Sequence, residues 1–314
     1  MKQVQFVAEN EALWAQIATM LEDKNADRRA LPAAYRRLCQ CLALARQRGY
    51  SPAIAEYLQN MVSQCHRELY GAGVARPTTL LRWMLVDFPC TVRAEWRLLL
   101  LASIALYVVA LVVGLMVWFE PHWAYSFSSA EKLESYRKMY MPGAMDAGRG
   151  SEGDVQMFGH YIWNNVSIGF RSFAGGIFGG VPALYSLTLN GIHTGVLAAW
   201  LSKDPLTRHH FWSFVITHSS FEITGLLLSA VAGMRLGLTV IHPGRRSRGH
   251  ALQVASRAIF PVMVGGGLMT FGAAFVEAFW SASTVVPQNV KYGVGALCWA
   301  LVIGFFVFAG RRRQ

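Results

Sequence analysis

Charged residues are scarce in this sequence. Only 15% of its 314 residues are Asp, Glu, Lys or Arg, whereas 54% are hydrophobic. A soluble protein of this length needs more charge than this to cover its surface. The composition therefore excludes an ordinary soluble globule and predicts a membrane protein.

Cysteines are also few, and their number does not suit a disulfide framework. The chain has five, and four of them precede residue 98. An odd set in a basic, polar segment is typical of reduced thiols in the cytoplasm. A glycine-rich phosphate loop with its lysine is missing as well, so the motifs exclude an ATPase.

The positive charge follows the pattern of membrane topology. The formal net charge is +11, but the basic residues lie mainly before residue 98 and in short clusters between apolar runs. Membrane proteins retain such clusters on the cytoplasmic side. We therefore expect the lipid bilayer as a partner of this chain and expect no nucleic acid.

The N-terminal part has the pattern of a soluble helical head. Residues 1–76 carry apolar residues at helical spacing, punctuated by Pro32, Gly49 and Gly71, which predicts about three helices in the cytoplasm. No signal peptide pattern opens the chain, so the first apolar run is expected to act as a signal anchor. Residues 77–97 mix apolar residues with charges and two tryptophans, which favours an amphipathic elbow helix at the membrane interface.

Residues 98–310 have the pattern of a transmembrane bundle. The run 98–119 is uncharged and long enough to cross the bilayer, and the polar segment 120–156 is predicted to be one large external loop. Further apolar runs cover 157–174, 176–201, 209–241, 258–281 and 292–310. The basic turn before residue 258 and the basic tail 311–314 should both be cytoplasmic. The sequence therefore predicts an all-α polytopic membrane bundle of about six spans, with both termini inside.

Polar side chains lie at similar depths within these runs. His218 and Glu222 are one helical turn apart, so they share a helix face. The predicted layer in the outer half of the membrane consists of Asn164, Asn165, Asn190, His193, His218 and Glu222. An ionisable group at mid-span costs about 2.5–3.5 kcal/mol unless it is paired or hydrated, so these groups should hydrogen-bond one another. Arg171 and Arg235 share a deeper level, where they are expected to extend to the cytoplasmic rim.

Small residues recur at intervals of four beside this layer. One stripe follows Glu222 along the same run, and a second occupies the boundary between the second and third runs. Such stripes let helix backbones approach closely in lipid. The residues predicted to serve helix packing are Gly175, Gly179, Gly225, Gly233 and Gly237.

Three motifs in this order resemble the stage II sporulation protein M family. They are an N-N-x-x-I pattern with G-x-x-x-G over 164–179, an N-G-x-x-x-G over 190–195, and an H-x-x-x-E with A-x-x-G-x-x-x-G over 218–237. The resemblance covers about residues 80–310 and implies a polytopic membrane fold. In spore-forming bacteria it further implies a scaffold that brings peptidoglycan-remodelling enzymes to the engulfing septum. Relatives of the family also occur in bacteria and archaea that make no spores, and the head and the external loop depart from a compact sporulation protein.

Three functions remain open at this stage. The first, which we favour, is a non-enzymatic scaffold or organiser of envelope and peptidoglycan remodelling in the bacterial inner membrane. The alternative is a permease-like transporter or channel whose path passes the layer of His218 and Glu222. The third is an intramembrane metal-dependent hydrolase, although H-x-x-x-E lacks the second histidine of H-E-x-x-H, and His160, His193 or His210 would have to complete the site.

These considerations give a restricted set of site predictions. We predict no catalytic residue, no metal ligand and no cofactor, and we favour a protein without enzymatic activity. The expected partners are the lipid bilayer and other membrane or envelope proteins, with homo-oligomers left open. The polar layer is expected to form a mutually hydrogen-bonded core of the bundle.

Overall fold

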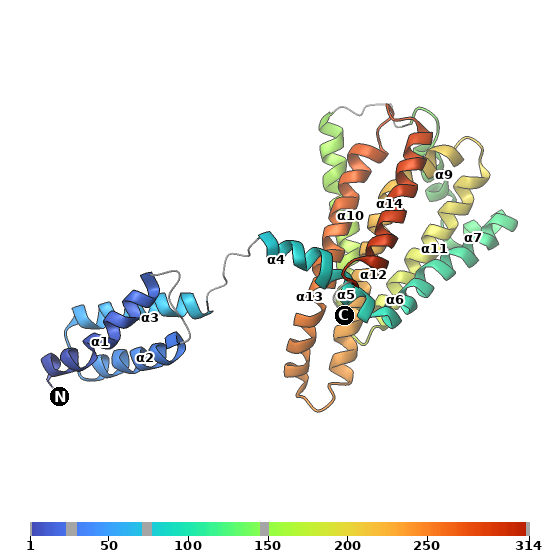
Figure 1. Ribbon diagram of the computed structural model, residues 1–314. Coiled ribbons are helices and arrows are strands. Elements are labelled where there is room, and N and C mark those ends of the chain that lie inside the picture. Colours follow the sequence, from blue (N-terminus) through green and yellow to red (C-terminus); the bar gives the residue numbers. More distant parts are fainter. Residues whose placement is uncertain (1, 23–29, 71–76, 145–150, 312–314) are drawn as a thin grey trace. The chain divides into compact units, whose positions relative to one another are not determined.

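The structure is a computed structural model that describes residues 2–22, 30–70, 77–144 and 151–311 (Figure 1). The chain forms two compact units, Met1–Pro77 and Thr78–Gln314, and each is considered by itself. All regular structure in the described residues is helical, without any strand. The protein is therefore all-α.

The described residues of the N-terminal unit form three helices with their own apolar core. The helices are α1 (Gln3–Glu22), α2 (Leu31–Gln47) and α3 (Pro52–Tyr70). Each helix contributes almost completely buried side chains to this core, including Phe6, Ile17, Leu38 and Leu58. Gly49 follows α2 with a φ of +62°, a left-handed conformation that glycine adopts without strain, so the chain can reverse into α3. The helical spacing of apolar residues thus produces a core within this unit alone.

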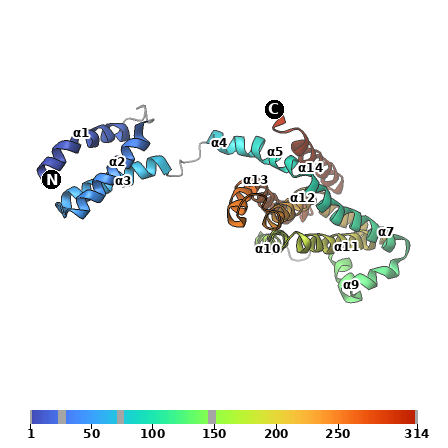
Figure 2. The same cartoon turned by 90° about the horizontal axis from the view of Figure 1, so that it is seen from below.

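The second unit contains the long helices (Figures 1 and 2). It begins with α4 (Pro77–Arg82), η2 (Trp83–Asp87), α5 (Phe88–Ala94), α6 (Trp96–Ser103), η3 (Ile104–Val108) and α7 (Val109–Phe119). Three short helices follow, η4 (Pro121–Trp123), α8 (Ala124–Phe127) and α9 (Ala130–Met139). The remaining helices are α10 (Ser151–Gly176), α11 (Val181–Lys203), α12 (Arg208–Ile241), α13 (Arg248–Phe275), η5 (Val276–Ser281) and α14 (Gln288–Phe308).

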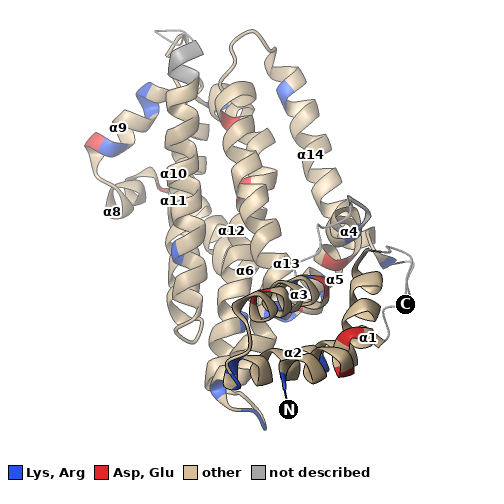
Figure 3. Cartoon of the chain, turned by 90° about the vertical axis from the view of Figure 1, so that its left-hand side faces the viewer, with Lys and Arg blue, Asp and Glu red and all other residues tan. Residues whose placement is uncertain are grey.

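Within the described residues, four helical stretches are long and apolar enough to cross a membrane, so the chain is a membrane protein. They are Trp96–Phe119, Arg208–Ile241, Arg248–Ser281 and Gln288–Phe308. Figure 3 shows that charged residues are sparse along the middle of these helices. The predicted runs 157–174 and 176–201 correspond to α10 and α11, which are not among the four. Asn164, Asn165 and Arg171 make α10 less apolar, and a total of six crossings remains a prediction.

Helix α12 lies at the centre of the bundle and packs against α10, α11, α13 and α14. Its glycines make these approaches close. Gly233 lies against the backbone of Phe173 in α10, and Gly237 lies against the backbone carbonyl of Gly176. Gly225 faces Thr270 of α13 in the same way. A side chain at any of the three α12 glycines would occupy space that the neighbouring helix already fills.

The glycines at the end of α10 and just after it combine helix packing with a turn. Gly179 was predicted on a packing stripe, but α10 ends at Gly176, and Gly179 and Gly180 have φ values of +75° and +86° in the turn to α11. Gly175 lies against Pro182 at the start of α11 and so packs inside the same turn. Gly176 lies against the α12 backbone at Gly233, and the backbone amide of Gly179 lies beside Gly237 of the same helix. A run of glycines can form either a helix stripe or a turn, because glycine accepts both helical and left-handed φ values.

The segment predicted as an external loop, 120–156, contains helices in its described part. Helix α9 begins after Ser129, whose side chain accepts a hydrogen bond from the Lys132 backbone amide and caps the helix. Leu133 of α9 is fully buried in a cluster with residues of α7 and α11. Most side chains of this segment are polar, whereas a few apolar ones such as Leu133 pack against the bundle.

The segment predicted as an interfacial elbow is helical and bends at one residue. Helix α5 ends before Glu95, which has φ of −95° and ψ of 25°, and α6 begins directly after it. Arg93 of α5 donates hydrogen bonds of 2.8 Å to the carbonyl oxygens of Phe306 and Ala309 at the end of α14. These two carbonyls at the C-terminus of α14 would otherwise lack a hydrogen-bond donor. The positive charge of Arg93 also interacts favourably with this helix end, so the arginine connects α5 to α14.

Candidate functional site

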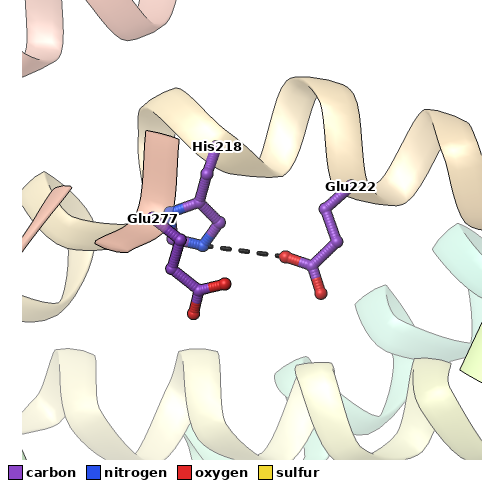
Figure 4. A group of neighbouring side chains, drawn as sticks. All are labelled: His218, Glu222 and Glu277. Atoms are coloured by element: carbon purple, nitrogen blue, oxygen red, sulfur yellow. Dashed lines mark ion pairs between the residues drawn. The ribbon is translucent and has the colours of Figure 1, made fainter. Parts of the chain in front are cut away.

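The ionisable pair of α12 lies in the interior of the bundle. His218 is 4% exposed, and its Nε2 lies 3.7 Å from Oε2 of Glu222 one turn along the helix. The Glu222 side chain is 32% exposed, so its carboxylate has more room to move than the imidazole. Figure 4 shows both side chains on the same face of α12. The helical spacing of four residues is what brings them together.

A second carboxylate, from a distant part of the chain, completes the group. Glu277 is 9% exposed and comes from η5, a π-helical turn that continues α13. Ligand atoms of His218, Glu222 and Glu277 all lie within 4.8 Å of one another (Figure 4). Single π-helical turns within longer helices are frequent at functional sites, because the extra residue redirects the side chains around it.

Asparagines of α10 support this second carboxylate. Asn165 is 5% exposed, and its Nδ2 donates to Oε2 of Glu277 at 3.3 Å. Oδ1 of Asn165 in turn accepts a hydrogen bond of 2.9 Å from Nδ2 of Asn164. The amide of Asn165 is therefore oriented by one neighbour and presents its donor to the carboxylate.

The imidazole is held from its other side. Nδ1 of His218 lies 3.0 Å from Oγ of Ser281, the last residue of η5. The carbonyl of Ser281 accepts a hydrogen bond of 2.8 Å from Nζ of Lys291 in α14, and the same ammonium donates to the carbonyl of Ser283. Helices α12, η5 and α14 thus meet through one chain of hydrogen bonds, which orients the His218 ring toward the two glutamates.

Two residues of the predicted layer have other partners. Asn190 donates its Nδ2 to the carbonyl of Ser186, one turn back on α11. His193 is exposed, and its Nε2 lies 3.4 Å from the hydroxyl of Tyr136 on α9. The structure thus brings together Asn164, Asn165, His218 and Glu222, while the two α11 residues make separate contacts.

The predicted arginine pair is also separated. Nε of Arg235 lies 3.1 Å from Oε1 of Glu95, so this arginine joins α12 to the bend between α5 and α6. Arg171 is exposed on α10. The shared depth of the two arginines in the sequence therefore does not produce a shared site.

A cavity lies beside the cluster on the side of α9. It has a volume of about 180 Å³, and its wall includes Tyr140, Phe214, Ser281 and Lys291. Burial raises the pKa of Tyr140 above its ordinary value, and the negative charge of Glu277 raises that pKa further. The cavity directly adjoins Ser281, the residue whose hydroxyl contacts His218.

The sequence interpretation missed Glu277 and Ser281. Both lie near the outer end of the predicted run 258–281, where residue counting places them above the level of His218. The one signal was the occurrence of an acidic residue within an apolar run. Depth counting failed because helices of one bundle begin at different heights and because η5 departs from α-helical spacing.

The cluster is suited to hold positive charge. Two carboxylates and an imidazole converge on one point from two helices, with Asn165 and Ser281 as outer supports. Carboxylates in an apolar interior require a proton, a cation or several hydrogen bonds, because a bare buried charge is costly. The arrangement can therefore exchange protons, bind a cation or act as a hydrogen-bonded lock between helices.

Comparisons with known proteins cover both units of the chain. The model of a family described as Stage II sporulation protein M matches residues 99–282, and a domain of unknown function (DUF8413) matches residues 4–71. An uncharacterized protein of Methanocaldococcus jannaschii is 32% identical over 79 residues, which are 25% of this chain and 44% of that protein. The chain thus spans less than half the length of that relative, and no solved structure matches.

The first of these matches includes the whole cluster. Residues 99–282 amount to more than half of the 314 residues, and they contain every helix that contributes to the site except α14. The three motifs that suggested the resemblance also lie within this range. The chain belongs to the stage II sporulation protein M family.

Proposed function

We propose that this protein is a membrane organiser that gathers other envelope proteins at sites of peptidoglycan remodelling. The observation that carries the proposal is the burial of the polar cluster at a junction of α10, α12 and η5. Residues that recruit partners need a rigid frame, and a hydrogen-bonded polar core with closely packed glycines supplies one. Membership of the sporulation family supports the same role.

The arrangement of the polar residues favours this role over transport. A transport path needs polar groups that line a water-filled route through the bundle. His218, Asn165 and Glu277 are each at least nine-tenths buried, and they are paired across helix interfaces. Asn190 and His193, which were expected to extend such a path, make contacts elsewhere.

The N-terminal unit is the natural element for partner docking in this proposal. It has a separate apolar core, so it can present its outer surface without disturbing the bundle.

We place this head and the C-terminus in the cytoplasm of a bacterial inner membrane, with α5 as an elbow at its surface. Reporters fused after Arg245 and after Gln314 should then give cytoplasmic signals, and one at Gly148 an external signal. An internal signal at Gly148 would contradict the placement.

The proposal is tested by purification of the intact chain from its native membranes. Proteins that synthesise or cleave peptidoglycan should be enriched over their level with an unrelated polytopic protein of equal expression. A matched bait with its head surface altered by Arg46→Glu should lose part of this enrichment, because Arg46 is exposed at a hydrogen bond to Gln59 and outside the head core. Absence of enriched envelope proteins, together with solute flux by the chain in liposomes, would overturn the proposal in favour of a transporter.

A further inference from the structure

We propose that His218, Glu222 and Glu277 bind one divalent transition-metal ion, with zinc as the reference ion. Each residue offers one ligand atom, and the three atoms lie within 4.8 Å of one another (Figure 4). The inference goes beyond the organising role, since it assigns a ligand to the polar cluster and does not depend on any partner protein.

The separations of the ligand atoms are close to those of a metal centre. Zinc lies about 2.0–2.2 Å from imidazole nitrogen and carboxylate oxygen, so ligands of one ion are roughly 3–4 Å apart. The nitrogen of His218 and the nearer oxygen of Glu222 are 3.7 Å apart. Glu222 is the most exposed of the three and has space to close the remaining gap by rotation of its side chain. Only small side-chain movements are therefore needed for coordination.

The outer contacts of the cluster resemble the supports of metal ligands. A metal-binding histidine normally uses its second ring nitrogen to bond a neighbouring polar group, which sets the ring orientation. His218 does this with Ser281 and keeps Nε2 directed toward the glutamates. Glu277 accepts a hydrogen bond from Asn165 through Oε2, which orients its carboxylate beside His218 and Glu222. Two of the three ligands thus have an orienting partner.

The ligand types select a class of ion. Magnesium and calcium prefer sites made only of oxygen ligands, so the imidazole of His218 argues against both. A nitrogen ligand with two carboxylates suits zinc, manganese, iron or cobalt, and no cysteine of the described residues contributes to the cluster. Three protein ligands leave a fourth position open for water.

The two carboxylates of the cluster and the cavity beside it are also compatible with a bound cation. A pair of ionised carboxylates in this apolar setting repel each other, and a divalent ion between them would neutralise both. The cavity of about 180 Å³ adjoins Ser281 and provides room for a hydrated ion to approach from the side of α9. The site would therefore join α12 to η5 through the ion and not through hydrogen bonds alone.

The test uses the full chain in lipid nanodiscs with any affinity tag removed. The protein is stripped with a chelator, dialysed against zinc and then against metal-free buffer, and its zinc content is measured by mass spectrometry. The wild type should retain about one ion per chain. His218→Gln and Glu277→Gln should retain almost none, and Asn165→Ala should weaken binding by about 10–100-fold because it removes an outer support.

Matched controls separate the site from incidental binding. His193→Gln removes an imidazole that contacts Tyr136, and Glu134→Gln removes a half-buried carboxylate of α9 that pairs with Arg137. Both should bind zinc as the wild type does. Equal binding by His218→Gln, Glu277→Gln and the controls would overturn the proposal.

A measurement on the wild type alone decides the question if the variants do not fold. X-ray absorption at the zinc edge should show nitrogen and oxygen neighbours with one imidazole and no sulfur, because the three proposed ligands include no thiol. Sulfur neighbours would overturn the proposal and indicate binding by cysteines. A folded wild type that retains no zinc would also overturn it, and would instead favour two carboxyl groups that share a proton.

Discussion

Replacement of Gly233 by alanine should destabilise the bundle by separating α12 from α10. An added Cβ would lie 2.8 Å from the carbonyl carbon and 2.9 Å from Cα of Phe173, and nearer still to its carbonyl oxygen. Ordinary contacts of this kind begin at 3.4 Å, so the carbon alone is about 0.6 Å too close. The obstacle is backbone, and therefore α10 must move as a whole. Overpacking of this kind costs about 1–3 kcal/mol.

The control for this prediction is the same substitution at an unobstructed glycine. A Cβ added at Gly267 of α13 would have no described atom of another residue within 4 Å beyond its own helical neighbours, so Gly267→Ala should be neutral or stabilise the helix by up to about 1 kcal/mol. Thermal unfolding of both variants in the same detergent compares their stabilities directly. It can be followed by circular dichroism or by loss of the monodisperse peak in size-exclusion chromatography. Equal unfolding temperatures for Gly233→Ala and Gly267→Ala would refute the reasoning that the backbone contact between α12 and α10 leaves no room for a side chain at residue 233.

Two further changes test the polar contacts. Asn165→Leu should lower the unfolding free energy by about 1–3 kcal/mol, because Glu277 loses a buried donor, whereas Asn190→Leu should have little effect since its amide bonds only its own helix. The Leu206 backbone amide and then Arg137 hold the pKa of Asp204 below its usual value. That stabilisation is present above the unfolded pKa of about 3.9 and is lost as the pH falls through the lower folded pKa. Asp204→Asn should reduce the loss of unfolding free energy at acidic pH. An unchanged pH dependence would exclude a contribution of Asp204 to stability.

The membrane helices and the head follow patterns that are local in the sequence. The uncharged run that begins at Leu98 contains most of α6 and continues through α7. The apolar spacing of the first 70 residues corresponds to α1, α2 and α3, whose buried faces meet in one core. Hydropathy and period are properties of consecutive residues, so they can be evaluated without knowledge of what each helix contacts.

Only some residues of the candidate site could be predicted from the sequence. His218 and Glu222 are neighbours by helical geometry, and this contact could be expected from their spacing. Asn165 reaches the site through Glu277, 112 residues away in the chain, and no local pattern indicates that contact. His193 was assigned to the same depth, yet the rotation of α11 directs it to Tyr136. Depth along a helix can be counted, whereas the direction of a side chain depends on how the helix is turned in the bundle.

The sequence by itself determined that this is a helical membrane protein of the sporulation M family, because apolar composition, helical period and motif spacing are written along the chain. It also determined that α12 carries His218 and Glu222 one helical turn apart. Only the tertiary structure decided that Glu277 joins this pair, that Gly176 meets α12, and that Gly179 forms a turn. These outcomes depend on the relative height, rotation and local winding of separate helices, which packing of the whole bundle sets.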